Sequence, residues 1–272
     1  MKHIVISHLE VDITQSCNLQ CLGCHHYSNL GLPETHSDET RLEWISNMAS
    51  ICNRLNVSTT RIKIVGGEPT LNNRLSEYIE AMSQIPHKEF VLASNGTNVI
   101  KNVSALKAFD VRLDLSHHSN SNMRYTSRFS KVVEAMKRAG VTYSINRAEN
   151  WVSMYKYCDG RIYPYNSQNI EASWKSCEAR NCTQLFDNKL WKCPPITFLR
   201  AALQKTGQLT DLEWKNYLHY RPLDLTDVSR DKMIAFFQRR DLPESVCAMC
   251  PSNATGIKNK PIYRKDYELV YE

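Results

Sequence analysis

The sequence predicts an α/β protein whose parallel sheet is either open or closed into a barrel. Short β-rich runs alternate with helical runs through the first 150 residues, and repeated βα units place their strands side by side in parallel. From about residue 170 this alternation stops, and cysteines, tryptophans and turn residues increase. We therefore expect an α/β domain over residues 1–170 and a smaller, cysteine-rich α+β domain over residues 171–272.

Individual strands and helices follow from the spacing of apolar residues. The expected strands cover residues 9–14, 61–65, 90–94, 111–116 and 141–146, and a sixth candidate covers 161–166. Three stretches between them repeat apolar residues with helical spacing. The faces that they would bury consist of Trp44, Ile45, Met48 and Cys52; of Leu75, Ile79 and Met82; and of Phe129, Val132, Val133 and Met136.

The expected strands alternate apolar and polar residues, although strands of a parallel sheet are usually apolar on both faces. Glu10 and Asp12 alternate with apolar residues in the first strand, as Arg61 and Lys63 do in the second. If the apolar faces pack on helices, the polar faces line the interior, where that many unpaired charges could not form a dry core. The pattern favours a wet cavity for a polar ligand, and edge strands that face water are the alternative.

Composition excludes several classes of protein. The 272 residues include 34 basic and 28 acidic ones, a net charge of +6, which is too mild for a nucleic-acid-binding arm. No run of about 18 apolar residues could span a membrane, and the first residues do not form a secretory signal. We therefore expect a cytoplasmic protein without a membrane or nucleic-acid partner. Its ten cysteines would be reduced there and available to bind metal.

Three of these cysteines follow the first expected strand. Cys17, Cys21 and Cys24 have the spacing Cys-x3-Cys-x2-Cys. Three thiolates can hold three corners of a cubane iron–sulfur cluster and leave the fourth iron open. A zinc site would need a fourth cysteine or histidine; it remains an alternative, and the spacing favours iron–sulfur.

A glycine-containing loop follows the second expected strand. Gly66 and Gly67 let the backbone approach a ligand closely, Glu68 offers a carboxylate, and Pro69 sets the turn. Together with the cysteine triplet, this loop resembles the radical SAM superfamily, and residues 94–96 (Ser-Asn-Gly) resemble a further turn of that family.

The resemblance implies a partial (β/α)6 barrel, a [4Fe–4S] cluster and S-adenosylmethionine (SAM). SAM would chelate the open iron and be cleaved to methionine and a 5′-deoxyadenosyl radical, which takes a hydrogen atom from substrate. The glycine loop would receive the methionine amino group, and Asn95, Ser116 and Asn146 stand where the family holds cofactor. The family's aromatic residue before the third cysteine is replaced by Gly23. His25 or Tyr27 would then contact adenine.

A second group of cysteines consists of Cys177, Cys182, Cys193, Cys247 and Cys250. Residues 182–193 predict a hairpin with Asp187 and Asn188 as its turn, which places Cys182 and Cys193 opposite each other. The group resembles the twitch domain, a relative of the longer SPASM domain, and so implies one auxiliary [4Fe–4S] cluster. Either Cys177 or Cys182 would be the spare thiol, and a structural zinc site is the alternative.

Two histidines, His117 and His118, follow the fourth expected strand. We expect His117 to act as a base that receives the proton lost in an oxidation, and a solvated loop is the alternative. The first functional hypothesis is oxidation of a small polar molecule, sugar-like or phosphorylated, with the auxiliary cluster accepting an electron. Similar small enzymes oxidise amino-cyclitol alcohols.

Two other functions remain open. One is modification of a ribosomally made peptide by crosslinking or epimerisation, although the first strand begins too early for a leader-binding module. The other is a metal-stabilised binding module without enzymatic activity, which would leave the glycine loop unexplained. An enzyme of this kind needs a reducing partner such as flavodoxin or ferredoxin.

Overall fold

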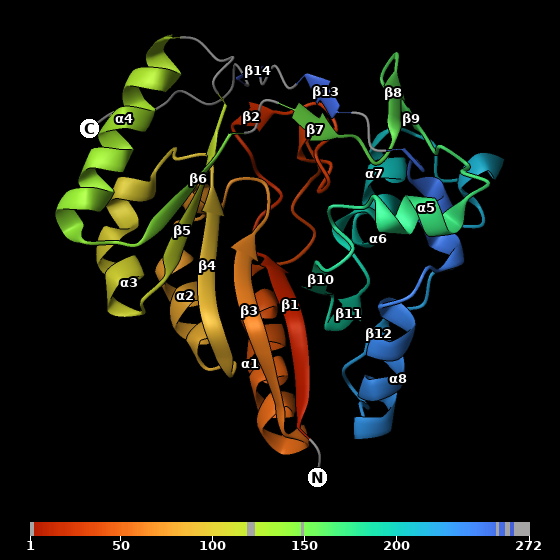
Figure 1. Ribbon diagram of the computed structural model, residues 1–272, viewed down its shortest axis with the longest axis horizontal. Helices are drawn as coiled ribbons and strands as arrows, with labels where there is room; N and C mark the ends of the chain where they lie inside the picture. The colour runs from red at the N-terminus through yellow and green to blue at the C-terminus, as the bar shows by residue number, and fades with distance from the viewer. Residues whose placement is uncertain (1–2, 119–122, 148–149, 254–255, 259–261, 264–272) are drawn as a thin grey trace.

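The computed structural model describes residues 3–118, 123–147, 150–253, 256–258 and 262–263 (Figure 1). Its main feature is an eight-stranded sheet with the order β12-β11-β10-β1-β3-β4-β5-β6. The bounds are β1 Ile4–Asp12, β3 Val57–Val65, β4 His87–Ser94, β5 Arg112–His117, β6 Tyr143–Arg147, β10 Thr183–Phe186, β11 Lys189–Trp191 and β12 Leu223–Asp224. The predicted α/β class with a mostly parallel sheet is confirmed, since β10, β1, β3, β4, β5 and β6 pair in parallel.

Helices α1 (Asp38–Leu55), α2 (Leu75–Ser83), α3 (Val103–Ala108) and α4 (Met123–Ala139) connect the parallel strands and lie together on one side of the sheet (Figure 1). Their predicted faces are buried and share one hydrophobic core with the strands. Helix α1 begins after Ser37, whose side chain accepts a hydrogen bond from the Thr40 amide, and ends at Asn56 in a left-handed conformation. Such caps satisfy amide groups that the helix itself leaves unpaired.

The sixth candidate strand was wrongly predicted as part of the sheet. Residues Arg161–Tyr163 form β9, which pairs antiparallel with β8 (Lys156–Cys158) in a separate hairpin. Asp159 and Gly160 both have positive φ, as a two-residue hairpin turn requires. The sixth parallel strand is β10 instead, which lies beside β1.

The cysteine-rich region begins with a helix and then joins the central sheet. The β10–β11 hairpin turns at Asp187 and Asn188, which both have positive φ as predicted. Because β10 pairs with β1, the sheet continues across the expected boundary at residue 170. The remaining helices of this region are α5 Ile170–Lys175, α6 Pro194–Thr197, α7 Leu199–Lys205 and α8 Arg230–Arg240. Phe198 separates α6 from α7.

A second hydrophobic core lies beneath this region, around the buried side chains of Trp214, Phe198 and Tyr155. Short strands complete the fold: β2 Leu19–Gln20, β7 Asn150–Val152, β13 Gly256–Lys258 and β14 Ile262–Tyr263. Among the described residues, no helix is long and apolar enough to cross a bilayer.

Charged side chains on the inner face of the sheet are paired with one another, which explains how the alternating strands are tolerated. Arg61 binds Glu89, Arg112 binds both Glu89 and Asp114, and Lys63 lies 3.5 Å from Asp114. Pairing removes most of the cost of placing charge beneath the cavity.

Candidate functional site

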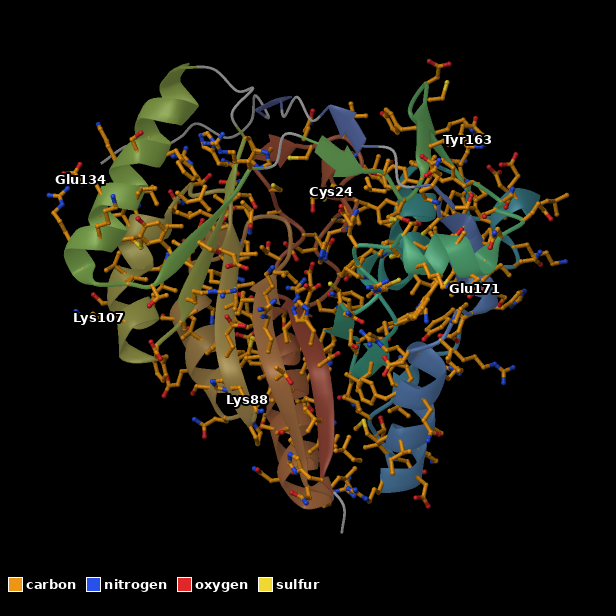
Figure 2. The ribbon with its side chains drawn as sticks, viewed as in Figure 1. Cys24, Lys88, Lys107, Glu134, Tyr163 and Glu171 are labelled. Atoms are coloured by element: carbon orange, nitrogen blue, oxygen red, sulfur yellow. The ribbon has the colours of Figure 1, made fainter. Side chains whose placement is uncertain are left out.

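A cavity of about 320 Å³ opens at the carboxyl ends of β1, β3, β4 and β5. The cysteine triplet, the glycine loop and the Ser-Asn-Gly turn all line it. Figure 2 places Cys24 beyond the ends of the central strands. Parallel strands bring the loops at their carboxyl ends to one edge of the sheet, so segments far apart in sequence meet at this cavity.

The cysteine loop turns tightly at Gly23. The Cys24 amide donates to the Cys21 carbonyl at 3.2 Å, and Gly23 has a φ of 74°. A side chain at that φ is strained, which explains why no aromatic residue stands before Cys24. All three thiols consequently face the cavity.

Burial raises the pKa of the Cys17 thiol well above its usual range, and Glu68 and the other two thiols raise it further. An iron–sulfur cluster or another cation would supply the positive charge that converts these thiols to thiolates. The donor set therefore fits a cubane cluster with one iron left open by the protein.

The two glycines of the second loop are required by contact with the cysteine loop. A β-carbon on Gly66 would lie 2.4 Å from the Thr14 carbonyl oxygen, and one on Gly67 would lie 2.2 Å from the Ser16 carbonyl oxygen. The Gly67 amide donates to Thr14 at 2.7 Å and the Glu68 amide to Ser16 at 2.8 Å. The sequence predicted close approach to a ligand, and the structure shows close approach to the backbone ahead of Cys17.

Glu68 is buried and links two segments. Its carboxylate accepts hydrogen bonds from the Ser94 hydroxyl at 2.7 Å, the Asn95 amide at 2.6 Å and the Thr70 hydroxyl at 2.6 Å. Burial raises its pKa, and these donors act in the opposite direction. Glu68 thus fixes the glycine loop against the Ser-Asn-Gly turn.

Asn95 extends this connection to the cysteine loop. Its Nδ2 donates to Asn18 Oδ1 at 2.9 Å, and Asn18 Nδ2 donates to Thr97 Oγ1 at 2.7 Å. Asn18 lies directly after Cys17, so the first cysteine of the triplet is held by the turn at the end of β4. Asn95, Ser116 and Pro69 line the cavity, where the sequence placed them.

Two groups at the site were missed by sequence reasoning. Glu34 accepts hydrogen bonds from the Thr14 hydroxyl at 2.5 Å and the Gln15 amide at 2.7 Å, and binds Arg41. His26 Nδ1 lies 3.1 Å from the buried Asp12 carboxylate, and His26 lines the cavity. No sequence pattern identifies Glu34; the His26–Asp12 pair could have been suspected from the polar alternation of β1.

Three predicted site residues lie elsewhere. Tyr27 is fully buried in the second hydrophobic core, stacks on Tyr155 and donates to the Pro195 carbonyl. Asn146 is exposed on edge strand β6. The His117 ring packs on Phe129 at a centroid distance of 4.4 Å. None of the three is among the described residues that line the cavity. Tyr27 and His117 pack on other side chains, and Asn146 lies beside Ser116 on the outermost strand of the sheet.

Their neighbours take those positions. His118 is 3% exposed and lines the cavity; burial lowers its pKa to about 4. His25 also lines the cavity, with Nε2 2.9 Å from the Val152 carbonyl oxygen. Burial lowers the pKa of His25 as well, so both imidazoles are neutral near pH 7. Among the rings that line the cavity, that of His25 is the nearest in sequence to Gly23.

Four of the five later cysteines form a second site. Cys177, Cys193, Cys247 and Cys250 line one small cavity with Lys192. Burial raises the pKa of all four thiols, and every pair among them interacts electrostatically. The four cysteines therefore lie around one cavity, and no three of them have sulfur atoms within 4.8 Å of one another. This spacing fits a cubane cluster, whose ligands are farther apart than those of a single zinc ion. Cys182, one of the two candidates for the spare thiol, does not line this small cavity and lines the main one.

Residues 11–145 match the family model of the radical SAM superfamily. The chain belongs to this superfamily. Radical SAM proteins use a [4Fe–4S] cluster and SAM, and the cysteine and glycine loops described above lie within the matched residues.

Two curated relatives share this segment. A probable GTP 3′,8-cyclase of Methanocella arvoryzae is 30% identical over 141 residues, which are 49% of this chain and 43% of that protein. A probable GTP 3′,8-cyclase of Saccharolobus solfataricus is 25% identical over 211 residues, covering 75% of this chain and 63% of that protein. The matched part is thus less than two thirds of either relative.

One solved structure covers almost the whole radical SAM chain. The structure of BtrN in complex with AdoMet and 2-DOIA has 14% sequence identity and a TM-score of 0.51, and it covers 93% of this chain and 98% of that one. This likeness concerns the fold, including the region after residue 170.

Proposed function

We propose that this chain is a radical SAM oxidoreductase that removes a hydrogen atom from a small polar substrate and oxidises it. Bound together, the first cluster and SAM would supply a 5′-deoxyadenosyl radical. Cys17, Cys21 and Cys24 would hold that cluster, and Gly66, Gly67, Glu68 and Pro69 would shape the place of the methionine group. A cytoplasmic reductant such as flavodoxin or ferredoxin would supply the first electron.

The proposal rests on the β10–β11 hairpin, which lies between the two groups of cysteines. Cys182 faces the main cavity, and Cys193 belongs to the four-cysteine site. The last register pair of β10 and β11 is Gln184 with Trp191. The same register continued by two residues would set Cys182 opposite Cys193, where opposed side chains stand about 5 Å apart at Cβ. An auxiliary cluster held by Cys193 would therefore lie close enough to the substrate to accept the second electron of an oxidation.

The charge of the cavity favours a small substrate without a triphosphate. Among the described residues that line it, Lys63 is the one lysine or arginine, and it already lies 3.5 Å from Asp114. Glu10 and Glu178 line the same cavity. Triphosphates are usually bound by several cationic or amide donors, whereas a polyol or amino sugar needs acceptors and few cations.

A GTP cyclase is the second candidate function, because the curated relatives carry that name and share 25–30% identity with this chain. BtrN was solved with 2-DOIA, which favours the first candidate through a full-length likeness of fold. A peptide substrate is the third candidate, and the experiment below includes it.

The experiment supplies reconstituted protein with SAM and dithionite and measures 5′-deoxyadenosine by mass spectrometry with each class of substrate. We expect small polyols or amino-cyclitols to increase 5′-deoxyadenosine and to lose two mass units as product. The variant Ser116→Ala tests the cavity wall, and Cys158→Ser, at an exposed position, is the control. Stimulation by GTP alone, with a cyclised product, would overturn the proposal in favour of the second candidate.

A further inference from the structure

His8, Glu10 and Cys182 form a group at the floor of the cavity that the proposed function does not use. His8 and Glu10 are two residues apart on β1, so their side chains leave the same face of the strand. β10 runs parallel to β1 with Leu9 beside Thr183 and Glu10 beside Gln184. The same register sets Cys182 level with His8, on that same face.

The distances within the group are those of metal ligands. One ligand atom from each of the three side chains lies within 4.8 Å of the other two. Cys182 Sγ is 4.0 Å from His8 Nδ1. Around a tetrahedral zinc ion, with bonds of about 2.3 Å to sulfur and about 2.0 Å to nitrogen, the ligand atoms lie roughly 3.5 Å apart. Small side-chain rotations would therefore close the group around an ion.

Two buried polar atoms, one in the group and one beside it, make no hydrogen bond, which is a second observation. His8 Nε2 is buried and makes no hydrogen bond, although Glu10 Oε1 is 3.4 Å away. Gln184 is fully buried, and its Oε1 is likewise unsatisfied while its Nε2 donates to Glu10. Buried polar atoms are nearly always paired, so these orphans indicate a missing ligand.

We propose that His8, Glu10 and Cys182 bind a zinc ion at the floor of the cavity. Thiolate, imidazole and carboxylate are each zinc ligands, and zinc sites with three protein ligands keep an open fourth position. Gln184 orients the carboxylate, as partners of zinc ligands commonly do. Binding would release the Cys182 thiol proton to solvent, and the thiolate and the Glu10 carboxylate together balance the charge of Zn²⁺.

The open position points to the cavity, since Glu10 and Cys182 both line it. A water molecule or a substrate hydroxyl oxygen would occupy it. Zinc occupancy itself does not depend on the proposed reaction, so the two claims can fail separately.

The test measures metals on the fully reconstituted holoenzyme, with iron in two cubane clusters, after incubation with ZnCl2 and desalting. We expect about one zinc per chain beside about eight iron atoms. The variants His8→Ala, Glu10→Gln and Cys182→Ser should each lower zinc at least tenfold and leave iron unchanged. Cys52→Ser, at an apolar core thiol, should keep both metals.

Zinc retained in all three variants, or absent from wild type, would overturn the proposal. Loss of about four iron atoms in Cys182→Ser would also overturn it, because Cys182 would then belong to the auxiliary cluster. X-ray absorption at the zinc edge separates these cases further, with one sulfur and two lighter protein ligands expected.

Discussion

Gly67→Ala should damage the first cluster site more than its single methyl group suggests. The new β-carbon would lie 2.2 Å from the Ser16 carbonyl oxygen and 2.5 Å from its carbon. Both atoms belong to the backbone, so no side chain can move aside. Either loop must shift, and the shift stretches the hydrogen bonds from Gly67 to Thr14 and from Glu68 to Ser16.

The magnitude follows from these contacts. Overpacking costs about 1–3 kcal/mol, and each weakened hydrogen bond costs about 1 kcal/mol. A combined loss of about 3 kcal/mol corresponds to a fall in Tm of about 5 °C for a chain of this size. Cys17 follows Ser16 directly, so the iron of the first cluster should be lost preferentially.

The matched control is Gly160→Ala. Gly160 has a φ of 77° and no atom within 4 Å of the new β-carbon, so its cost is the left-handed strain of about 1 kcal/mol alone. Tm by calorimetry and iron per chain are measured for both variants. Equal Tm values for Gly67→Ala and Gly160→Ala, with full iron in both, would refute the reasoning.

Three further predictions concern other parts of the molecule. Because the folded-state pKa of His118 is about 4, below the unfolded value of about 6.5, the unfolded chain binds the extra proton and stability falls as pH decreases from 6.5 toward 4. Between pH 7.5 and 5.5 this protonation lowers the free energy of unfolding by about 1.3 kcal/mol. His118→Gln should remove that part of the pH dependence of Tm, and an unchanged dependence in the variant would exclude the role of His118. Cys250→Ser should lose the auxiliary cluster, about four iron atoms, and keep the first; loss of all iron would contradict two separate sites. Lys192→Met should destabilise by about 3 kcal/mol, because buried Lys192 donates to the Arg240 and Leu242 carbonyls and pairs with Glu244, whereas exposed Lys175→Met should leave Tm unchanged.

Local patterns predicted much of the fold. Helix faces such as Ile45 and Met48 followed from their spacing and are buried, and the Asp187–Asn188 turn followed from residues that tolerate positive φ. The hairpin at Asp159–Gly160 carried the same signal and was overlooked. The sequence could not predict the pairing of β10 with β1, because strand order depends on contacts between segments about 170 residues apart.

In the candidate site too, local motifs were predictable and the directions of individual side chains were not. The spacing of Cys17, Cys21 and Cys24 and the glycine loop were sufficient to predict their convergence. Which of two nearby residues faces the cavity was not predictable. His118 lines the cavity where His117 was expected, and of the two candidates His25 and Tyr27 it is His25 that lines it. At the end of a strand, a small change in loop conformation reverses the direction of a side chain. The choice between Cys177 and Cys182 was likewise left open by the sequence, and Cys182 lines the main cavity.

The central claim is that Cys17, Cys21 and Cys24 hold a cluster that cleaves SAM. The most direct measurement is 5′-deoxyadenosine released by reconstituted protein under dithionite, compared with the variant Cys17→Ala, Cys21→Ala, Cys24→Ala, with iron counted in both. We expect release from wild type, and none from the variant, which keeps about four iron atoms in the auxiliary site. Continued release by the variant, or no release by wild type with both clusters loaded, would contradict the account.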